Sequence, residues 1–301
     1  MNYGLVDAHC HPTHKSPGEL GHLFSRMVAL RVEKILIPGV DVEEYPEIRN
    51  QFSKIDKGKK EVFFALGMHP QWSAAWLQGF HTNTPYFGKS NVSLISHPWL
   101  TIAKNILNDE VRQVLCKCDA PAAWGEVGLD KQGPQWLPWL QEVEPNLPTL
   151  WFEWQKMVLE LWIEWAAKSN KPIIFHNRGF AGPSLEIWER THKIHPQLKF
   201  QWHSFGGSLP VAQRIIRANG YVSILFSMTT PKNASTLKWI WENAKHRLLL
   251  ESDSPYQMSW ENLPILYEQV ATILNISLES LEVQMNHNLS EFLNGGNFLL
   301  Q

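Results

Sequence analysis

The sequence predicts a (β/α)8 TIM barrel, an α/β fold, with extended loops after the third and fourth strands. Eight short apolar runs alternate with longer amphipathic segments, which is the pattern of a parallel sheet whose strands are joined by helices. The chain has 301 residues, a length at which such barrels form single domains. No internal repeat, low-complexity tract or linker divides the chain, so we expect one domain over residues 1–301.

The expected elements alternate along most of the chain. Strands are expected at 3–7, 34–39, 62–67, 122–127, 172–176, 198–203, 220–226 and 247–253. Helices are expected at 19–32, 43–57, 98–116, 150–170, 183–194, 208–218, 233–245, 260–274 and 278–293. Ser208 and Ser277 are typical residues for the start of a helix, because a hydroxyl accepts a hydrogen bond from a backbone N–H of the first turn.

Two connections are longer than a crossover between neighbouring strands requires. About fifty residues separate Pro70 from the fourth strand, and about twenty separate Asp130 from the helix near Leu150. Both connections begin at the carboxyl end of a strand, where barrels of this kind carry their functional residues. We therefore expect both of them to overhang that end of the barrel.

Composition narrows the classes of protein that fit. Asp7, His9 and His11 interrupt any apolar run near the start, and no segment reaches the roughly 18 to 20 apolar residues of a membrane helix. We expect a cytoplasmic protein with no membrane contact and with reduced thiols at its three cysteines. A net charge of −2 provides no bulk basic surface, so binding of nucleic acid would need metal ions and local groups.

The chain is rich in tryptophan, with 15 residues of this type. One set follows the spacing of a helix face and is expected to pack in the interior: Trp151, Trp154, Trp162 and Trp165. A second set lies in loop-like sequence: Trp72, Trp76, Trp136 and Trp139. For this second set two interpretations stay open, namely packing, or an aromatic surface that stacks bases or contacts a protein partner.

Residue types that ligate metals stand at the ends of five predicted strands. His9 and His11 end the first strand and point the same way, because side chains alternate along a strand, so they could bind one ion together. The other four strands, the fourth, fifth, sixth and eighth, end at Glu126, His176, His203 and Asp253. Any one of these could be a residue satisfied within the core. Five strands that end in this way favour a shared site, since a barrel directs these ends to one volume.

Mixed imidazole and carboxylate ligands suit Zn, Mn, Co or Fe, and Mg becomes favoured if phosphate oxygens complete its shell. Six ligands exceed what one catalytic ion needs, which favours two divalent ions. With a bridging carboxylate, the ligand groups would be His9, His11, Glu126 and Asp253 for one ion and Glu126, His176 and His203 for the other. Two such ions would lower the pKa of a bound water and neutralise charge that develops on an attacked centre. The pattern predicts a metal-dependent hydrolase.

Six motifs carry a resemblance to a known family. They are Asp7-Ala8-His9-Cys10-His11, Gly67-Met68-His69-Pro70, Gly125-Glu126-Val127-Gly128-Leu129-Asp130, His176-Asn177-Arg178, His203-Ser204-Phe205-Gly206-Gly207 and Glu251-Ser252-Asp253-Ser254-Pro255-Tyr256. In their order, and together spanning nearly the whole chain, they resemble the TatD family of metal-dependent deoxyribonucleases within the amidohydrolase superfamily. Many members of that superfamily carry a carboxylated lysine on the fourth strand, where this chain has a glutamate.

The resemblance implies a TIM-barrel enzyme that hydrolyses DNA phosphodiester bonds from an end, with two divalent ions (Mg, Mn or Zn) on the six residues named above. It implies catalytic roles for Glu126 and Asp253, with Asp253 accepting a proton from the attacking water. It places His69 and Arg178 near the phosphate, and a guanidinium suits phosphate oxygens in a fork geometry. The simpler interpretations are a helix-capping histidine and a surface arginine.

Departures from the family pattern occur after Arg178 and after His203, and the long connections are rich in tryptophan. A divergent member of this kind resembles the TatD-like nucleases found beside other enzymes in bacterial antiphage operons, including the Qat type, which implies a role in antiviral defence. Two alternatives stay open. One is a hydrolase of a small phosphoester, an amide or a lactone, and the other is an accessory subunit that binds protein partners through its tryptophan-rich loops.

Overall fold

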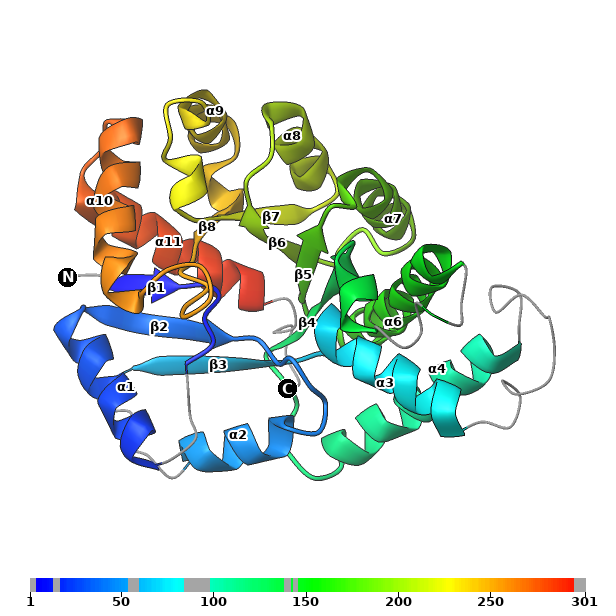
Figure 1. The fold of residues 1–301 in the computed structure, drawn as a ribbon. Helices are drawn as coiled ribbons and strands as arrows, with labels where there is room; N and C mark the ends of the chain where they lie inside the picture. Colours follow the sequence, from blue (N-terminus) through cyan, green and yellow to red (C-terminus); the bar gives the residue numbers. More distant parts are fainter. Residues whose placement is uncertain are drawn as a thin grey trace, which may run out of the picture.

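The computed structural model describes residues 4–12, 17–53, 60–83, 98–137, 142 and 146–294. Eight parallel strands lie in the order β1 to β8 and alternate with helices in a nearly closed (β/α)8 barrel (Figure 1), which confirms the predicted fold class. The strands are β1 (Leu5–Asp7), β2 (Val32–Ile37), β3 (Glu61–Leu66), β4 (Ala123–Asp130), β5 (Ile173–Arg178), β6 (Phe200–Phe205), β7 (Gly220–Ile224) and β8 (Leu248–Leu250). The helices are α1 (Pro17–Ala29), α2 (Tyr45–Ser53), α3 (Pro70–Asn83), α4 (Pro98–Leu115), α6 (Leu147–Ser169), α7 (Ala181–Ile194), α8 (Leu209–Arg217), α9 (Ala234–Ala244), α10 (Leu263–Leu274) and α11 (Leu278–Leu293).

The barrel is completed where its first and last strands meet. The backbone N–H of Ala8 donates to the carbonyl of Leu250 at 3.0 Å, and that of Asp253 donates to the carbonyl of His9 at 2.8 Å. These two bonds join the segments that follow β1 and β8. The residues just beyond both strands are therefore held together by backbone geometry.

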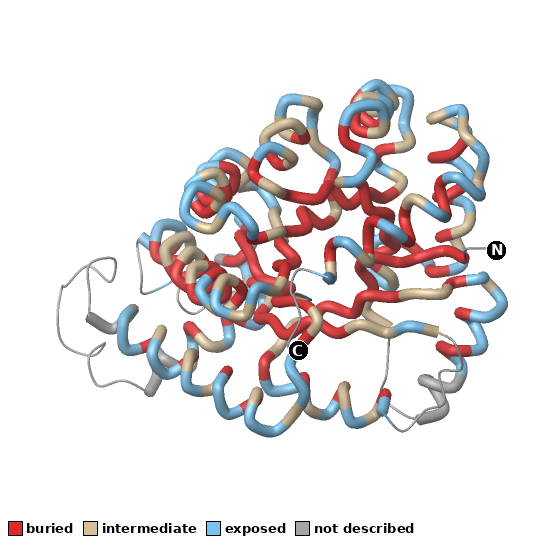
Figure 2. The backbone as a smooth tube through the Cα atoms, turned by 180° about the vertical axis from the view of Figure 1, so that it is seen from behind, coloured by how far each residue is buried: buried red, intermediate tan, exposed pale blue. Residues whose placement is uncertain are grey.

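Buried residues lie along the strands and on the inner faces of the helices, whereas the outer helix faces are exposed (Figure 2). All eight residues of β4 are buried. In β2 and β3 the last three residues are buried, whereas the second and third residues of β2 and the first three of β3 are more exposed. The most buried part of these strands therefore lies next to their carboxyl ends.

Helix α6 carries the tryptophans that helical spacing assigned to the interior. Trp151, Trp154 and Trp162 are at most 1% exposed, and Trp165 is partly buried with its indole N–H donating to Asn108. The indole N–H of Trp151 donates to the carbonyl of Asp130 at 2.6 Å, which links the helix to the end of β4. The packing interpretation of this set is confirmed.

Helix α3 is the main difference from the sequence-based expectation. Residues 70–83 were expected in an extended loop, but they form a helix, so Trp72 and Trp76 lie in helical rather than loop-like sequence. The segment holds few charged residues and a mid-helix Gly79, which weakens the amphipathic pattern that predicts a helix. Trp136 lies in a short 3-10 helix, and Trp139 lies outside the described residues.

Strand and helix limits differ from the expectation by a few residues. β8 ends at Leu250 rather than at 253, and the backbone N–H of Asp253 donates instead to the carbonyl of His9 in the segment after β1. β4, β5 and β6 continue to Asp130, Arg178 and Phe205, so Glu126, His176 and His203 lie within these strands rather than at their last residues, where they were expected. Ser277 caps its helix by accepting from the N–H of Ser280, as predicted, whereas the Ser208 side chain makes no such bond. Among the described residues, no helix is long and apolar enough to cross a membrane.

Candidate metal centre

The segment that follows β1 places two histidines side by side at the end of the barrel. The backbone N–H of Cys10 donates to Leu36 and that of His11 donates to Ser254, so the segment is held in an extended path between β2 and the loop after β8. His9 and His11 consequently point the same way, and their Nε2 atoms lie 3.0 Å apart. His9 is fully buried.

Glu126 lies at the middle of the cluster, and its two oxygens face different histidines. Oε2 lies 3.3 Å from Nε2 of His9 and 3.6 Å from Nε2 of His11. Oε1 lies 2.7 Å from Nδ1 of His176 and 3.1 Å from Nε2 of His203. A single carboxylate thus connects two pairs of histidines that come from three different strands.

Gly125 makes this placement of Glu126 possible. Its φ of +126° lies in a region that side chains rarely adopt, and a Cβ atom there would lie 2.4 Å from the carbonyl oxygen of Ile174. The strand therefore needs glycine immediately before the central carboxylate.

Asp253 completes the cluster from the segment after β8. Its Oδ1 lies 3.5 Å from Nε2 of His11 and 3.7 Å from Nε2 of His9. Its backbone adopts a left-handed conformation with φ of +48°, which turns the side chain into the barrel mouth. The side chain is 7% exposed.

The histidines of β5 and β6 each have a second carboxylate behind them. Nε2 of His176 lies 3.3 Å from Oδ2 of Asp130, and Nδ1 of His203 lies 3.3 Å from Oε1 of Glu251. Neither carboxylate was among the residues expected at the site. Both stand in the motifs that carried the family resemblance, four residues after Glu126 and two before Asp253, which is the signal that could have found them.

Charge distribution favours an anionic centre surrounded by imidazoles. Burial by itself would raise the pKa of Glu126, but its interactions with the surrounding imidazoles, that with His203 the largest, hold it well below its usual range. Burial likewise opposes ionisation of Asp253, yet its hydrogen bond with His11 and the charge of His9 lower its pKa overall. Both carboxylates are therefore anions at neutral pH.

The donor atoms pass a geometric test for cation binding. Ligand atoms about 2.0 to 2.2 Å from one ion lie about 3 to 3.5 Å from one another. The donor pairs described above lie 2.7 to 3.7 Å apart. Three overlapping groups have all their ligand atoms within 4.8 Å, namely His9, His11 and Glu126; His9, His203 and Asp253; and His69, Glu126 and His176.

A cavity of about 450 Å³ opens onto this centre. His69 and Arg178, expected near the substrate, both line it. Nε2 of His69 lies 3.8 Å from Oε1 of Glu126, and its Nδ1 accepts the backbone N–H of Gln71 at 3.1 Å. Burial lowers the pKa of His69 to about 3, so its ring is neutral at physiological pH. Trp72, 40% exposed, lines the same cavity.

The six predicted ligands thus meet in one cluster, with His69 and Arg178 on the wall of the cavity above it. A family model described as TatD related DNase matches residues 6–294. The chain belongs to the TatD family. As a TatD family member it is a metal-dependent hydrolase with the amidohydrolase type of barrel.

Curated relatives of this TatD protein are distant in sequence. It is 25% identical over 256 residues to an uncharacterized metal-dependent hydrolase of Buchnera aphidicola, covering 84% of this chain and 81% of the relative. It is 25% identical over 247 residues to Deoxyribonuclease Tat-D of Schizosaccharomyces pombe, covering 82% of this chain and 67% of the relative.

Two solved structures share the fold. A TatD homologue from Escherichia coli matches with a TM-score of 0.69 and 19% identity, over 98% of this chain and 99% of the other. An uncharacterized amidohydrolase from Saccharomyces cerevisiae matches with a TM-score of 0.72 and 16% identity, over 96% of this chain and 99% of the other. These likenesses extend over the whole barrel.

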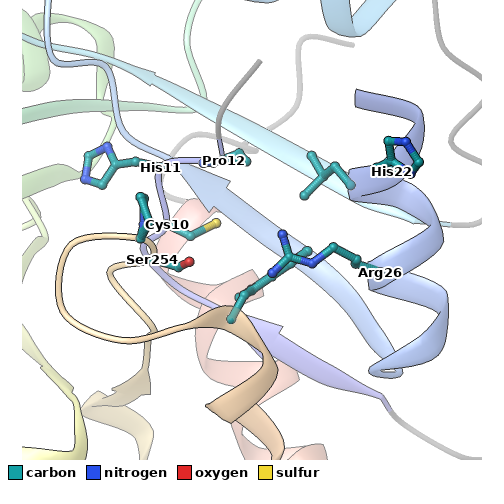
Figure 3. Close-up of a pocket in the computed structure, with 9 residues that line it drawn as sticks. Cys10, His11, Pro12, His22, Arg26 and Ser254 are labelled. Atoms are coloured by element: carbon teal, nitrogen blue, oxygen red, sulfur yellow. The ribbon is translucent and has the colours of Figure 1, made fainter. Parts of the chain in front are cut away.

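A second, smaller cavity of about 180 Å³ lies on the other side of His11 in this TatD protein (Figure 3). Cys10 and Ser254 border it on the barrel side, and His22 and Arg26 of α1 border it on the other. The Arg26 guanidinium is held by Glu261 at 2.5 Å and lies 5.4 Å from the ring centre of Trp260. These contacts fix α1 beside the segment that carries Asp253.

Proposed function

We propose that this TatD protein is a deoxyribonuclease that uses two divalent metal ions (Mg, Mn or Zn) to hydrolyse DNA phosphodiester bonds, acting from a strand end. The observation that carries the proposal is the division of Glu126. Its Oε2 faces His9 and His11, whereas its Oε1 faces His176 and His203. A carboxylate with one oxygen toward each of two donor groups is suited to bridge two cations.

We assign two ion positions to the cluster. The His9–His11 position would be held by His9, His11, Asp253 and Oε2 of Glu126. The His176–His203 position would be held by His176 through Nδ1, His203 through Nε2 and Oε1 of Glu126. Bound divalent ions supply Lewis acidity, which neutralises phosphate charge and makes water a better nucleophile.

Asp253 is the proposed proton acceptor. Its carboxylate is anionic, lies at the mouth of the cavity and is close to both histidines of the first position. It can therefore take a proton from water that approaches a phosphorus atom held in the cavity. Both oxygens of Glu126, the other carboxylate of the centre, face histidines, which leaves Asp253 as the proton acceptor.

His69 and Arg178 are suited to hold the phosphate. Because Nδ1 of His69 accepts the N–H of Gln71, the ring proton of the neutral imidazole stands on Nε2, which faces the centre as a donor. Arg178 lines the same cavity from the end of β5 and offers a planar fork of N–H groups. Together they provide one neutral and one charged donor for phosphate oxygens.

The substrate assignment to DNA draws on the cavity and on the relatives. Trp72 and Tyr256, 40% and 75% exposed, stand at its mouth and offer flat faces on which bases can stack. The S. pombe relative is named as a deoxyribonuclease.

End-labelled single- and double-stranded DNA, incubated with the protein and Mg²⁺, Mn²⁺ or Zn²⁺, tests this function. We expect a ladder of products shortened from one end, abolished by Asp253→Asn. Intact DNA with all three metals, together with cleavage of small phosphoesters, amides or lactones, would assign the site to another hydrolase. A stoichiometric protein partner whose function survives Glu126→Ala would assign the protein an accessory role.

We extend this proposal to antiphage defence on the sequence resemblance described above. Cells that express the chain with the genes neighbouring its own should produce fewer phage plaques. The Glu126→Ala variant should remove this protection, since it removes the bridging carboxylate. Equal plaque counts for the wild type and an empty vector would contradict a defensive role.

A further inference from the structure

Two buried carboxylates approach the metal centre without facing the volume that a cation would occupy. Asp130 is 1% exposed and Glu251 is fully buried. Asp130 lies 3.3 Å from His176 on the ring nitrogen opposite Glu126, and Glu251 lies 3.3 Å from His203 on the nitrogen opposite Glu126. Each of these histidine rings therefore stands between two carboxylates.

The carboxylate of Asp130 is held in place by the loop that follows β4. Its Oδ1 accepts the backbone N–H of Gln132 at 2.7 Å, while its own backbone N–H donates to Gln155 of α6 at 2.6 Å. Because these two contacts fix the position of Asp130, its carboxylate can hold the His176 ring in one orientation.

The carboxylate of Glu251 is held even more firmly. Oε1 accepts the backbone N–H of Ser204 at 2.5 Å, and Oε2 accepts from the Ser223 hydroxyl at 2.5 Å and from the Gln201 amide at 3.0 Å. Three donors from β6 and β7 thus fix the carboxylate behind His203.

His9, on the other side of the centre, lacks such a carboxylate. The buried Nδ1 atoms of His9 and His203 both lack an aligned hydrogen bond among the described residues, but only Nδ1 of His203 has a carboxylate beside it, that of Glu251 at 3.3 Å. Asp7, the buried carboxylate nearest to His9 in sequence, accepts the backbone N–H of His9 at 3.3 Å and takes its other hydrogen bonds from Ser252 and Trp260. The two proposed ion positions therefore differ in what orients their histidines.

We propose that Asp130 and Glu251 are positioning residues that serve the His176–His203 position alone, so that replacing either carboxylate by its amide weakens ion binding at this position and not at the other. The inference rests on the two-ion function proposed above. A carboxylate behind a ligating histidine fixes the ring and makes the imidazole a stronger donor, and its loss weakens metal binding by about 10- to 100-fold. The His9–His11 position has Asp253 as a direct ligand instead.

Calorimetric titration of the metal-free full chain with Mn²⁺, with bound metal counted by mass spectrometry, tests this assignment. We expect two binding events in the wild type. Asp130→Asn and Glu251→Gln should each weaken one event by about 10- to 100-fold and leave the other within about twofold. Asp253→Asn should weaken the remaining event, and Asp253→Asn combined with Glu251→Gln should weaken both.

Glu282→Gln is the matched control, because Glu282 is 3% exposed, pairs with Arg31 at 3.2 Å and lies on α11 away from the centre. It should leave both events unchanged. Wild-type binding in Asp130→Asn and Glu251→Gln, or equal weakening of both events, would overturn the inference. A wild type that binds one ion would overturn the two-ion function as well, whereas two normal binding events without DNA cleavage would overturn the nuclease function alone.

Discussion

Ser252 donates two hydrogen bonds to Asp7, from its backbone N–H to Oδ1 at 2.9 Å and from its hydroxyl to Oδ2 at 2.6 Å. Trp260 adds a third at 2.7 Å. These bonds join the end of β1 to the segment after β8, where His9 and Asp253 face each other. The hydrogen bonds that close the barrel between β1 and β8 therefore also bring His9 and Asp253 together.

Asp7 should make stability depend on pH. Burial raises its pKa to about 7 against the hydrogen bonds that lower it. A carboxyl with a raised pKa binds its proton more tightly in the folded state, so its contribution to stability falls as pH rises from about 4 to 7, by up to about 4 kcal/mol. Asn at this position does not titrate. The difference in the free energy of unfolding between the wild type and Asp7→Asn should therefore shrink as the pH rises from about 4 to 7. Urea denaturation at pH 5 and pH 8 measures it, and a difference that stays constant would contradict the prediction.

Gly125→Ala should destabilise the fold by about 3 kcal/mol or more, because the added Cβ meets the Ile174 carbonyl in a backbone conformation that alanine rarely adopts. Gly182→Ala is the control, since nothing lies within 4 Å of a Cβ at that helical position. Urea denaturation of both variants checks the difference. Equal stability of the two variants would show that β4 can shift to accept a side chain before Glu126.

Removal of metal should lower thermal stability, because the centre collects buried histidines and carboxylates that a bound cation holds together. A ligand at 100 times its Kd stabilises the folded state by about 2.7 kcal/mol per ion. A chelator should therefore lower Tm by several degrees relative to protein with Mn²⁺ in that excess. Asp253→Asn should show a smaller difference, and a Tm that ignores the chelator would argue against a metal centre.

Arg178→Ala should raise KM for DNA by about 10- to 100-fold, since a charge-assisted hydrogen bond contributes about 1.5 to 3 kcal/mol. Arg178→Lys should recover only part of this loss, because an ammonium lacks the planar fork. Mn²⁺ stoichiometry should stay at the wild-type value in both variants. Steady-state kinetics on labelled DNA gives the comparison, and unchanged KM values would mean that the exposed Arg178 does not bind the substrate.

Trp72→Ala should weaken DNA cleavage while leaving hydrolysis of a small phosphodiester unchanged. Stacking of one base contributes about 1 to 3 kcal/mol, so we expect a 5- to 150-fold loss on DNA only. Trp72→Phe should retain most of the activity because it keeps an aromatic face. Equal losses on both substrates would mean that the ring supports the centre rather than the nucleic acid.

Sequence alone predicted eight strands, the barrel that they form and six polar residues near the carboxyl ends of these strands, because an apolar run and the polar residues close to its end are local features of the chain. It did not reveal α3, whose residues 70–83 lack the charge pattern that marks an amphipathic helix. Nor did it separate the exposed Trp72 from the buried Trp154, since exposure depends on what packs against each helix.

Only the tertiary structure decided how the ends of the strands combine. It divided the two oxygens of Glu126 between two pairs of histidines, and it brought Asp130 and Glu251 behind His176 and His203. These relationships join residues that are 46 to 117 positions apart along the chain, from Asp130 and His176 to His9 and Glu126. They arise because closure of the barrel brings distant residues within hydrogen-bonding distance. The spacing of residues along the chain does not predict which of these distant residues pair.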